Sequence, residues 1–159
     1  MMSGMLPLTL TLHSLMRWVV ILLGIWVVGR AKMGWFLKRP WTQADDLGGR
    51  FFVIAFDVQV LLGLLLYFVL SPITTGAFQN MGAAMQNSVV RFWVAEHIAG
   101  MLIALALAHI GRARVRRATS DRSRHWRVVW FFGFALLVAL LATPWPFMPV
   151  GRPWFPGAP

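Results

Sequence analysis

The chain contains no cysteine and only five acidic residues among its 159 residues. The absence of cysteine excludes disulfide bonds, thiolate zinc sites, iron–sulfur clusters and covalent c-type haem attachment within this chain. Any bound metal must therefore be held by histidine, methionine or carboxylate side chains. The few acids leave a formal net charge of +10 beside 58% hydrophobic residues, and this composition is wrong for an ordinary soluble domain.

Long apolar runs account for most of the chain. A helix needs about 20 residues to cross the hydrocarbon core of a bilayer, and four runs reach or approach that length. They lie at about 8–28, 51–70, 92–110 and 128–142. We therefore expect an all-α fold, a four-transmembrane-helix bundle that forms a single membrane domain over residues 1–159.

The basic residues are concentrated beside two of these runs. Twelve of the fifteen Lys and Arg residues fall within Arg30–Arg50 and Arg112–Arg127, which follow the first and third runs. The positive-inside rule places both stretches in cytoplasmic loops and both termini outside, an N-out/C-out topology. Because this charge adjoins membrane spans, we expect the lipid bilayer and its anionic headgroups as partner, and no nucleic acid.

The segments on the expected outer side carry little charge. The outer loop, residues 71–91, has no charged residue before Arg91, and Phe78, Met81 and Met85 are spaced to share one face of a short surface helix.

The tail, residues 143–159, is rich in proline and aromatic residues. It should therefore be non-helical and lie along the outer membrane interface. Residues 1–12 have no basic residue and no small-residue cleavage site, so we expect the first span to be retained rather than removed as a signal peptide.

Four histidines are the candidate functional residues. His13 and His97 each lie about a turn and a half inside the outer end of a span, at matching depth. Two imidazoles from two helices at one level are the axial ligand set of a six-coordinate b-type haem. We therefore predict that His13 and His97 ligate a haem iron. The simpler interpretation is that each makes an interhelical hydrogen bond.

Two arginines are positioned to support a haem at this end. Arg17 follows His13 by four residues, on nearly the same helix face, and Arg91 begins the third span. Both are candidate contacts for haem propionates, since the guanidinium fork suits carboxylates. Alternatively, Arg17 and Glu96 neutralise each other, because unpaired charge inside a membrane is costly.

A stripe of small residues lies near His97 on the third span. It either leaves room for a flat ring or allows close helix packing. Its members are Gly100, Ala104 and Ala108.

The histidines on the cytoplasmic side, His109 and His125, form a second candidate cofactor pair. Twelve residues separate His97 from His109, which turns the two side chains about 120° apart around the helix, so they must face different neighbours. His125 lies in a basic segment, so the alternative interpretation is that it is one solvated residue of a basic loop. Asp57 inside the second span either accepts a hydrogen bond from Arg50 or His109, or serves a proton relay or a quinone contact.

Several short motifs resemble a group of small bacterial four-helix membrane proteins labelled cytochrome b-like. The matching pieces are Leu12–Trp18, Asp57–Gly63, Glu96-His97, His109–Arg114 and Pro144–Phe147. The resemblance implies haem b and a multi-pass position in the inner (plasma) membrane of a bacterium.

These observations together predict a b-type haem-binding subunit for electron transfer, within a larger membrane complex or a homo-oligomer, with a quinone pool as one candidate electron partner. A haem-free accessory subunit of a respiratory or photosynthetic complex is the alternative, and a small proton or metal-ion carrier is a third. The sequence has no nucleotide-binding glycine loop, serine elbow or HExxH motif, so it offers no stand-alone catalytic motif.

Overall fold

The computed structural model describes residues 2–155, which form helices joined by short segments and contain no β-strand. Four helical stretches are long and apolar enough to cross a membrane, which confirms the predicted all-α class and the number of spans. They are Gly4–Phe36, Gln43–Leu70, Ser88–Arg116 and Asp121–Ala142. Residue 1 and residues 156–159, the last part of the predicted tail, lie outside the described residues.

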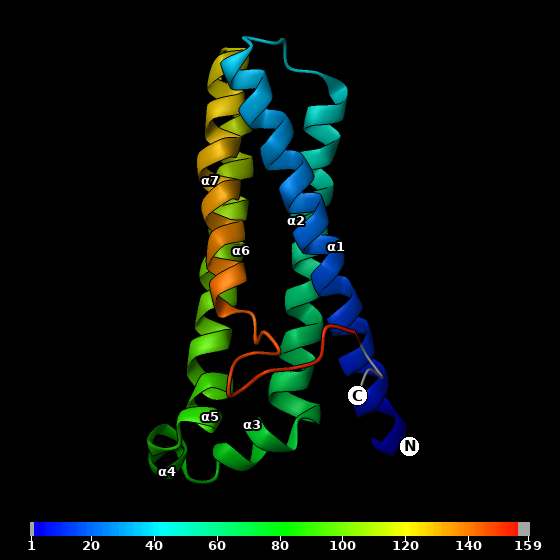
Figure 1. Cartoon of the computed structure of the whole chain (residues 1–159), viewed down its shortest axis with the longest axis vertical. Coiled ribbons are helices and arrows are strands. Elements are labelled where there is room, and N and C mark those ends of the chain that lie inside the picture. Colours follow the sequence, from blue (N-terminus) through cyan, green and yellow to red (C-terminus); the bar gives the residue numbers. More distant parts are fainter. Residues whose placement is uncertain (1, 156–159) are drawn as a thin grey trace.

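The long helices form a four-helix bundle (Figure 1). α1 (Met2–Phe36) packs against α2 (Gln43–Leu65) and α7 (Asp121–Ala142), and α6 (His97–Arg116) packs against α7 and α2. The two short connections, α1 to α2 and α6 to α7, lie at one end of the bundle. The N-terminal end of α1, the short helices and the tail lie at the other end, so the basic stretches gather together at one end.

Each long helix extends beyond its apolar run into sequence that we expected to be loop. α1 continues through Arg30 to Phe36, and α6 continues to Arg116. Lys38 then takes a left-handed conformation (φ 52°) that turns the chain, and Thr42 caps α2 in a capping box with Asp45. Most of the basic residues therefore lie on helical turns rather than in long loops.

Two carboxylates fasten the helices at this basic end. Asp45 is almost fully buried and accepts from Arg30 Nε at 3.0 Å and from Arg39 Nη2 at 2.8 Å, which ties α2 to the end of α1. Asp46 accepts both terminal nitrogens of Arg112, at 2.7 and 3.0 Å. This two-pronged contact joins α2 to α6.

Large aromatic side chains and small residues fill the centre of the bundle. Phe52, Phe56 and Phe132 are fully buried, and so are Ala104 and Ala108.

The small-residue stripe of α6 faces α7. A Cβ added at Gly100 would lie 2.6 Å from the Cβ of Ala142, so the two helices meet there at close range. The stripe therefore serves helix packing, and the interpretation that it leaves room for a flat ring is wrong.

His125 is a core residue. It is 0% exposed, its Nε2 donates to the backbone oxygen of Arg39 at 3.1 Å, and its ring lies 5.0 Å from the ring of Trp41. A Cβ added at Gly34 of α1 would overlap the His125 ring. The interpretation of His125 as a solvated loop residue is therefore wrong, because the turn after α1 folds over the start of α7.

Gly34→Ala is expected to lower the free energy of unfolding by about 2 kcal/mol, because the new methyl group overpacks the His125 ring. Thermal unfolding in detergent, followed by circular dichroism, measures the loss. Gly29→Ala on the same helix is the matched control, since nothing lies within 4 Å of its added Cβ. Combining Gly34→Ala with His125→Ala should cost less than the sum of the two single changes, and an additive result would contradict the overlap.

The outer loop is built from three short helices. These are α3 (Pro72–Ala77), α4 (Met81–Gln86) and α5 (Ser88–Arg91). Phe78 follows α3, whereas Met81 and Met85 belong to α4, which Asn80 caps. The expectation that these three apolar residues share a single surface helix is wrong, because the Asn80 cap starts a new helix between them.

Candidate functional site

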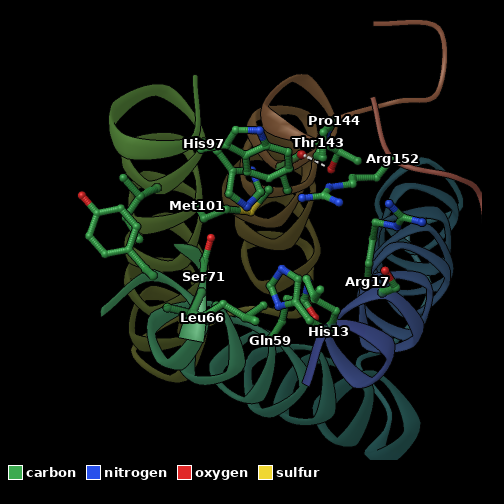
Figure 2. A pocket seen from close by; sticks show the side chains of 18 of the residues that line it. His13, Arg17, Gln59, Leu66, Ser71, His97, Met101, Thr143, Pro144 and Arg152 are labelled. Carbon is green, nitrogen blue, oxygen red and sulfur yellow. Dashed lines mark hydrogen bonds between the residues drawn. The ribbon is translucent and has the colours of Figure 1, made fainter. Parts of the chain in front are cut away.

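A cavity of about 350 Å³ lies inside the bundle at the end that holds the short helices (Figure 2). Its walls come from α1, α2, α3, α6, the end of α7, the tail and the two π-helical segments described below, and most of its surface is apolar. The polar or charged side chains in its lining are Thr11, His13, Ser14, Arg17, Gln59, Tyr67, Ser71, Thr74, His97, Thr143 and Arg152. A concave, mostly apolar cavity with a few convergent polar groups is the usual form of a small-molecule or cofactor site.

His13 of α1 and His97 of α6, which the sequence placed at matching depth, both line this cavity. Figure 2 shows the two side chains entering the space from different helices. Their ring centroids are 6.4 Å apart and their planes are inclined by 75°. A metal–imidazole bond is about 2 Å long, so two imidazoles on opposite sides of one metal ion have centroids about 6 Å apart. The observed separation is therefore close to what one bridging metal ion requires.

The local structure fixes the orientation of His97. Its Nδ1 donates to the backbone oxygen of Ala142 at 2.8 Å, one of the carbonyls that the end of α7 leaves without a helical partner. The rings of Phe92 and Trp93 lie 5.8 and 5.6 Å away. A ligating histidine commonly donates its second ring nitrogen to a carbonyl or carboxylate in this way. Nε2 of His97 remains free for a ligand.

His13 is held by α2. Its Nε2 lies 3.3 Å from the side-chain amide nitrogen of Gln59, and a Cβ added at Gly63 would lie 3.2 Å from its Cε1. The glycine thus makes room for the ring. Within residues 2–155, Nδ1 of His13 and Oε1 of Gln59 are buried without hydrogen-bond partners. Unpaired buried polar atoms are rare and costly, so the His13 end of the cavity is suited to a ligand that supplies a partner.

Two segments of π-helix border the cavity. η1 (Leu66–Leu70) ends the second span, and η2 (Phe92–Glu96) immediately precedes His97. The hydroxyl of Tyr67 in η1 donates to the oxygen of Val94 in η2 at 2.8 Å, which ties the two segments together. π-Helical turns are uncommon and are frequent at functional sites, because the extra residue re-aims the side chains that follow.

The described part of the tail crosses the cavity mouth. Arg17 donates to the backbone oxygens of Pro153 and Trp154, at 3.4 and 2.8 Å. The indole nitrogen of Trp18 donates to the backbone oxygen of Trp154 at 2.9 Å. The Arg152 guanidinium lies 5.1 Å from the ring centroid of Trp93. Arg17 and Arg152 therefore place two cations at the cavity, as Figure 2 shows.

The other predicted site residues lie elsewhere. Arg91 donates to Glu96 at 2.8 Å, and this exposed pair does not line the cavity. The proposed pairing of Arg17 with Glu96 is thus wrong, because each makes other contacts.

The second histidine pair is not brought together. His109 donates to Asp57 of α2, one of the two contacts considered for that carboxylate, whereas His125 donates to the backbone of Arg39. Among residues 2–155, no three His, Asp or Glu side chains gather into a metal site. A haem iron, by contrast, needs only two axial ligands from the protein.

Sequence reasoning missed several residues of the cavity. Arg152 and Trp93 come together only because the tail folds back, and no sequence spacing relates them. Gln59 was detectable in principle, since it is a buried amide in an apolar span close to Asp57. No family model matches the chain, and no curated protein or solved structure is significantly similar to it.

Proposed function

We propose that this protein is a b-type haem-binding membrane subunit for electron transfer. The observation that carries the proposal is the meeting of His13 and His97 in one cavity with ring centroids 6.4 Å apart. Two neutral imidazoles from separate helices are a strong axial ligand set for haem iron. When bound, a haem would supply one-electron redox chemistry.

The residues of the cavity fit this group. His97 is oriented by the Ala142 carbonyl, and His13 is placed by Gln59 and the space above Gly63. Apolar side chains from α1 and α2 line the walls. Arg17 and Arg152 offer positive charge to the two propionates of a haem, a role for which Arg152 replaces the predicted Arg91.

We further propose that the protein spans a bacterial inner membrane with the basic end in the cytoplasm. This orientation follows from the positive-inside rule, and the bundle supports it by gathering the basic stretches at one end. The cavity then lies near the outer surface, where an external redox protein, a partner subunit or a quinone in the bilayer can approach it.

An absorption spectrum of the purified protein tests the function directly. A reduced-minus-oxidised difference spectrum should show the α-band of a low-spin b haem at about one haem per chain. Protein that is folded and purified from haem-replete cells, yet shows no such band, would contradict the proposal. That result would favour the haem-free accessory subunit.

Arg17→Gln is expected to lower the midpoint potential of the haem on the order of 50 mV, because a nearby positive charge stabilises the reduced form more than the oxidised form. Potentiometric titration of membranes or purified protein measures the shift. Arg91→Gln is the matched control, since Arg91 is exposed, pairs with Glu96 and lies outside the cavity. Equal shifts in both variants would contradict the assignment of Arg17 to the haem.

A further inference from the structure

One ion pair in the membrane-spanning region faces outward from the bundle. Nε2 of His109 on α6 donates to Oδ1 of Asp57 on α2 at 2.7 Å, and the two side chains remain 53% and 38% exposed. Neither residue lines the His13–His97 cavity. What these residues do is therefore independent of the proposed haem function.

The pair lies well inside the hydrocarbon. Asp57 is seven residues from Arg50 and thirteen from Leu70 on one continuous helical stretch, which is about 10 Å and about 20 Å along the axis. Their sum matches the roughly 30 Å of a hydrocarbon core, so Asp57 is about one third of the way across. Ionisable groups at such depth face protein or a water-filled cavity rather than lipid, because exposure to lipid is costly.

The surface around the pair is shaped for close contact with another helix. On α6, Ala99, Ala106 and Ala113 recur every seven residues and are all exposed, with His109 between the last two. On α2, Ile54 and Leu61 are exposed on either side of Asp57, three residues before it and four after it. Small residues at an outward face let helix backbones approach closely.

This outward stripe is distinct from the inward one. Gly100, Ala104 and Ala108 are used within the chain, where α6 packs against α7. The alanines of the outward stripe have no such role among residues 2–155, where they remain exposed. α6 therefore carries two small-residue faces, of which the bundle itself buries one.

The hydrogen-bonding groups of the pair are complementary to a copy of themselves. Within the described residues, the bond between His109 Nε2 and Asp57 Oδ1 is the only one that either side chain makes. Each chain thus presents one unused ring nitrogen of His109 and one unused carboxylate oxygen of Asp57, side by side. In the ion pair with Asp57 both ring nitrogens of His109 carry a proton, so under twofold symmetry the unused N–H of one copy donates to the unused carboxylate oxygen of the other, and the reverse, which is the pattern of an isologous interface.

We propose that a second copy of this chain packs against the face formed by Ile54, Asp57 and Leu61 of α2 and Ala99, Ala106, His109 and Ala113 of α6. His109 of each copy hydrogen-bonds to Asp57 of the other across the twofold axis. The contact removes the ionisable pair from lipid, and the three alanines allow the two α6 helices to approach.

Cysteine cross-linking in native membranes tests this interface, and the absence of native cysteine makes each introduced thiol unique. Ala106→Cys should form a disulfide-linked dimer upon copper-phenanthroline oxidation, seen on a non-reducing gel. Phe134→Cys is the matched control, because Phe134 is exposed on α7 at a similar depth in the bundle. Phe134 is seven residues from Arg127, and Ala106 is six residues from Arg112. We expect several-fold more dimer from Ala106→Cys than from Phe134→Cys.

Three results would overturn the proposal. These are equal dimer yields at the two positions, no dimer from Ala106→Cys, and a product in which Ala106→Cys is joined to a different protein. In the Ala106→Cys background, Asp57→Leu with His109→Leu should reduce the dimer several-fold while the melting temperature shows that the chain stays folded. An unchanged yield in this folded variant would contradict the role of the pair.

Discussion

Replacement of His97 by Ala is expected to abolish the reduced α-band of the proposed haem, and His13→Ala should do the same. Each substitution removes one of the two proposed axial ligands, and no other imidazole lines the cavity within the described residues. The measurement is the dithionite-reduced spectrum and the haem-to-protein ratio of each purified variant. We expect at least a tenfold loss of the low-spin signal, since a six-coordinate low-spin haem needs both axial ligands.

His109→Ala is the matched control, because His109 is an intramembrane histidine that does not line the cavity. It should retain the full α-band. His97→Met distinguishes ligation by His97 from a purely structural role. Methionine offers iron a weaker ligand, so this variant should restore a low-spin haem with a raised midpoint potential. Loss of the band in His109→Ala, or an unchanged band in both His13→Ala and His97→Ala, would refute the ligand assignment.

Asp45→Ala is expected to cause the largest loss of stability among single changes at the basic end. The buried carboxylate accepts from Arg30, Arg39 and Thr42 and completes the capping box of α2. Removing one partner of a buried ion pair costs about 3 to 5 kcal/mol, and we expect about 3 kcal/mol because both arginines are roughly one third exposed. Thermal unfolding in detergent should show a fall in melting temperature of about 10 °C.

Asp121→Ala serves as the control for Asp45→Ala. Asp121 also lies in the first turn of its helix and pairs with an arginine, but the pair with Arg124 is exposed and 3.4 Å long. Its loss should cost no more than about 0.5 kcal/mol. Similar losses in the two variants would show that the Asp45 cluster contributes no more than a surface ion pair.

Much of the fold follows from local properties of the sequence. The four spans were readable because each apolar run is long enough to cross a bilayer, and backbone groups inside a membrane must be satisfied within a helix. The helix ends were less readable, since Arg30 and Arg112 look like loop residues. Their side chains are instead held by Asp45 and Asp46, so the helices continue through them.

The cavity was readable only in part. The sequence alone predicted that His13 and His97 lie at the same depth, because the rise per residue of a helix converts residue number into position along the helix axis. Position along the axis does not tell in which direction a side chain projects from the helix, and that direction decides which residues it contacts. His109 therefore faces outward toward Asp57, while His125 is buried under Trp41.

The amino-acid sequence by itself determined the helical class, the number of spans and the level of the histidines, since these depend on hydrophobic length and helical rise. Only the tertiary structure decided which residues complete the cavity. The tail brings Arg152 to Trp93 and its backbone oxygens to Arg17, across more than 130 residues of sequence separation from α1. Such contacts arise from packing between segments that share no periodicity, and a linear pattern carries no information about them.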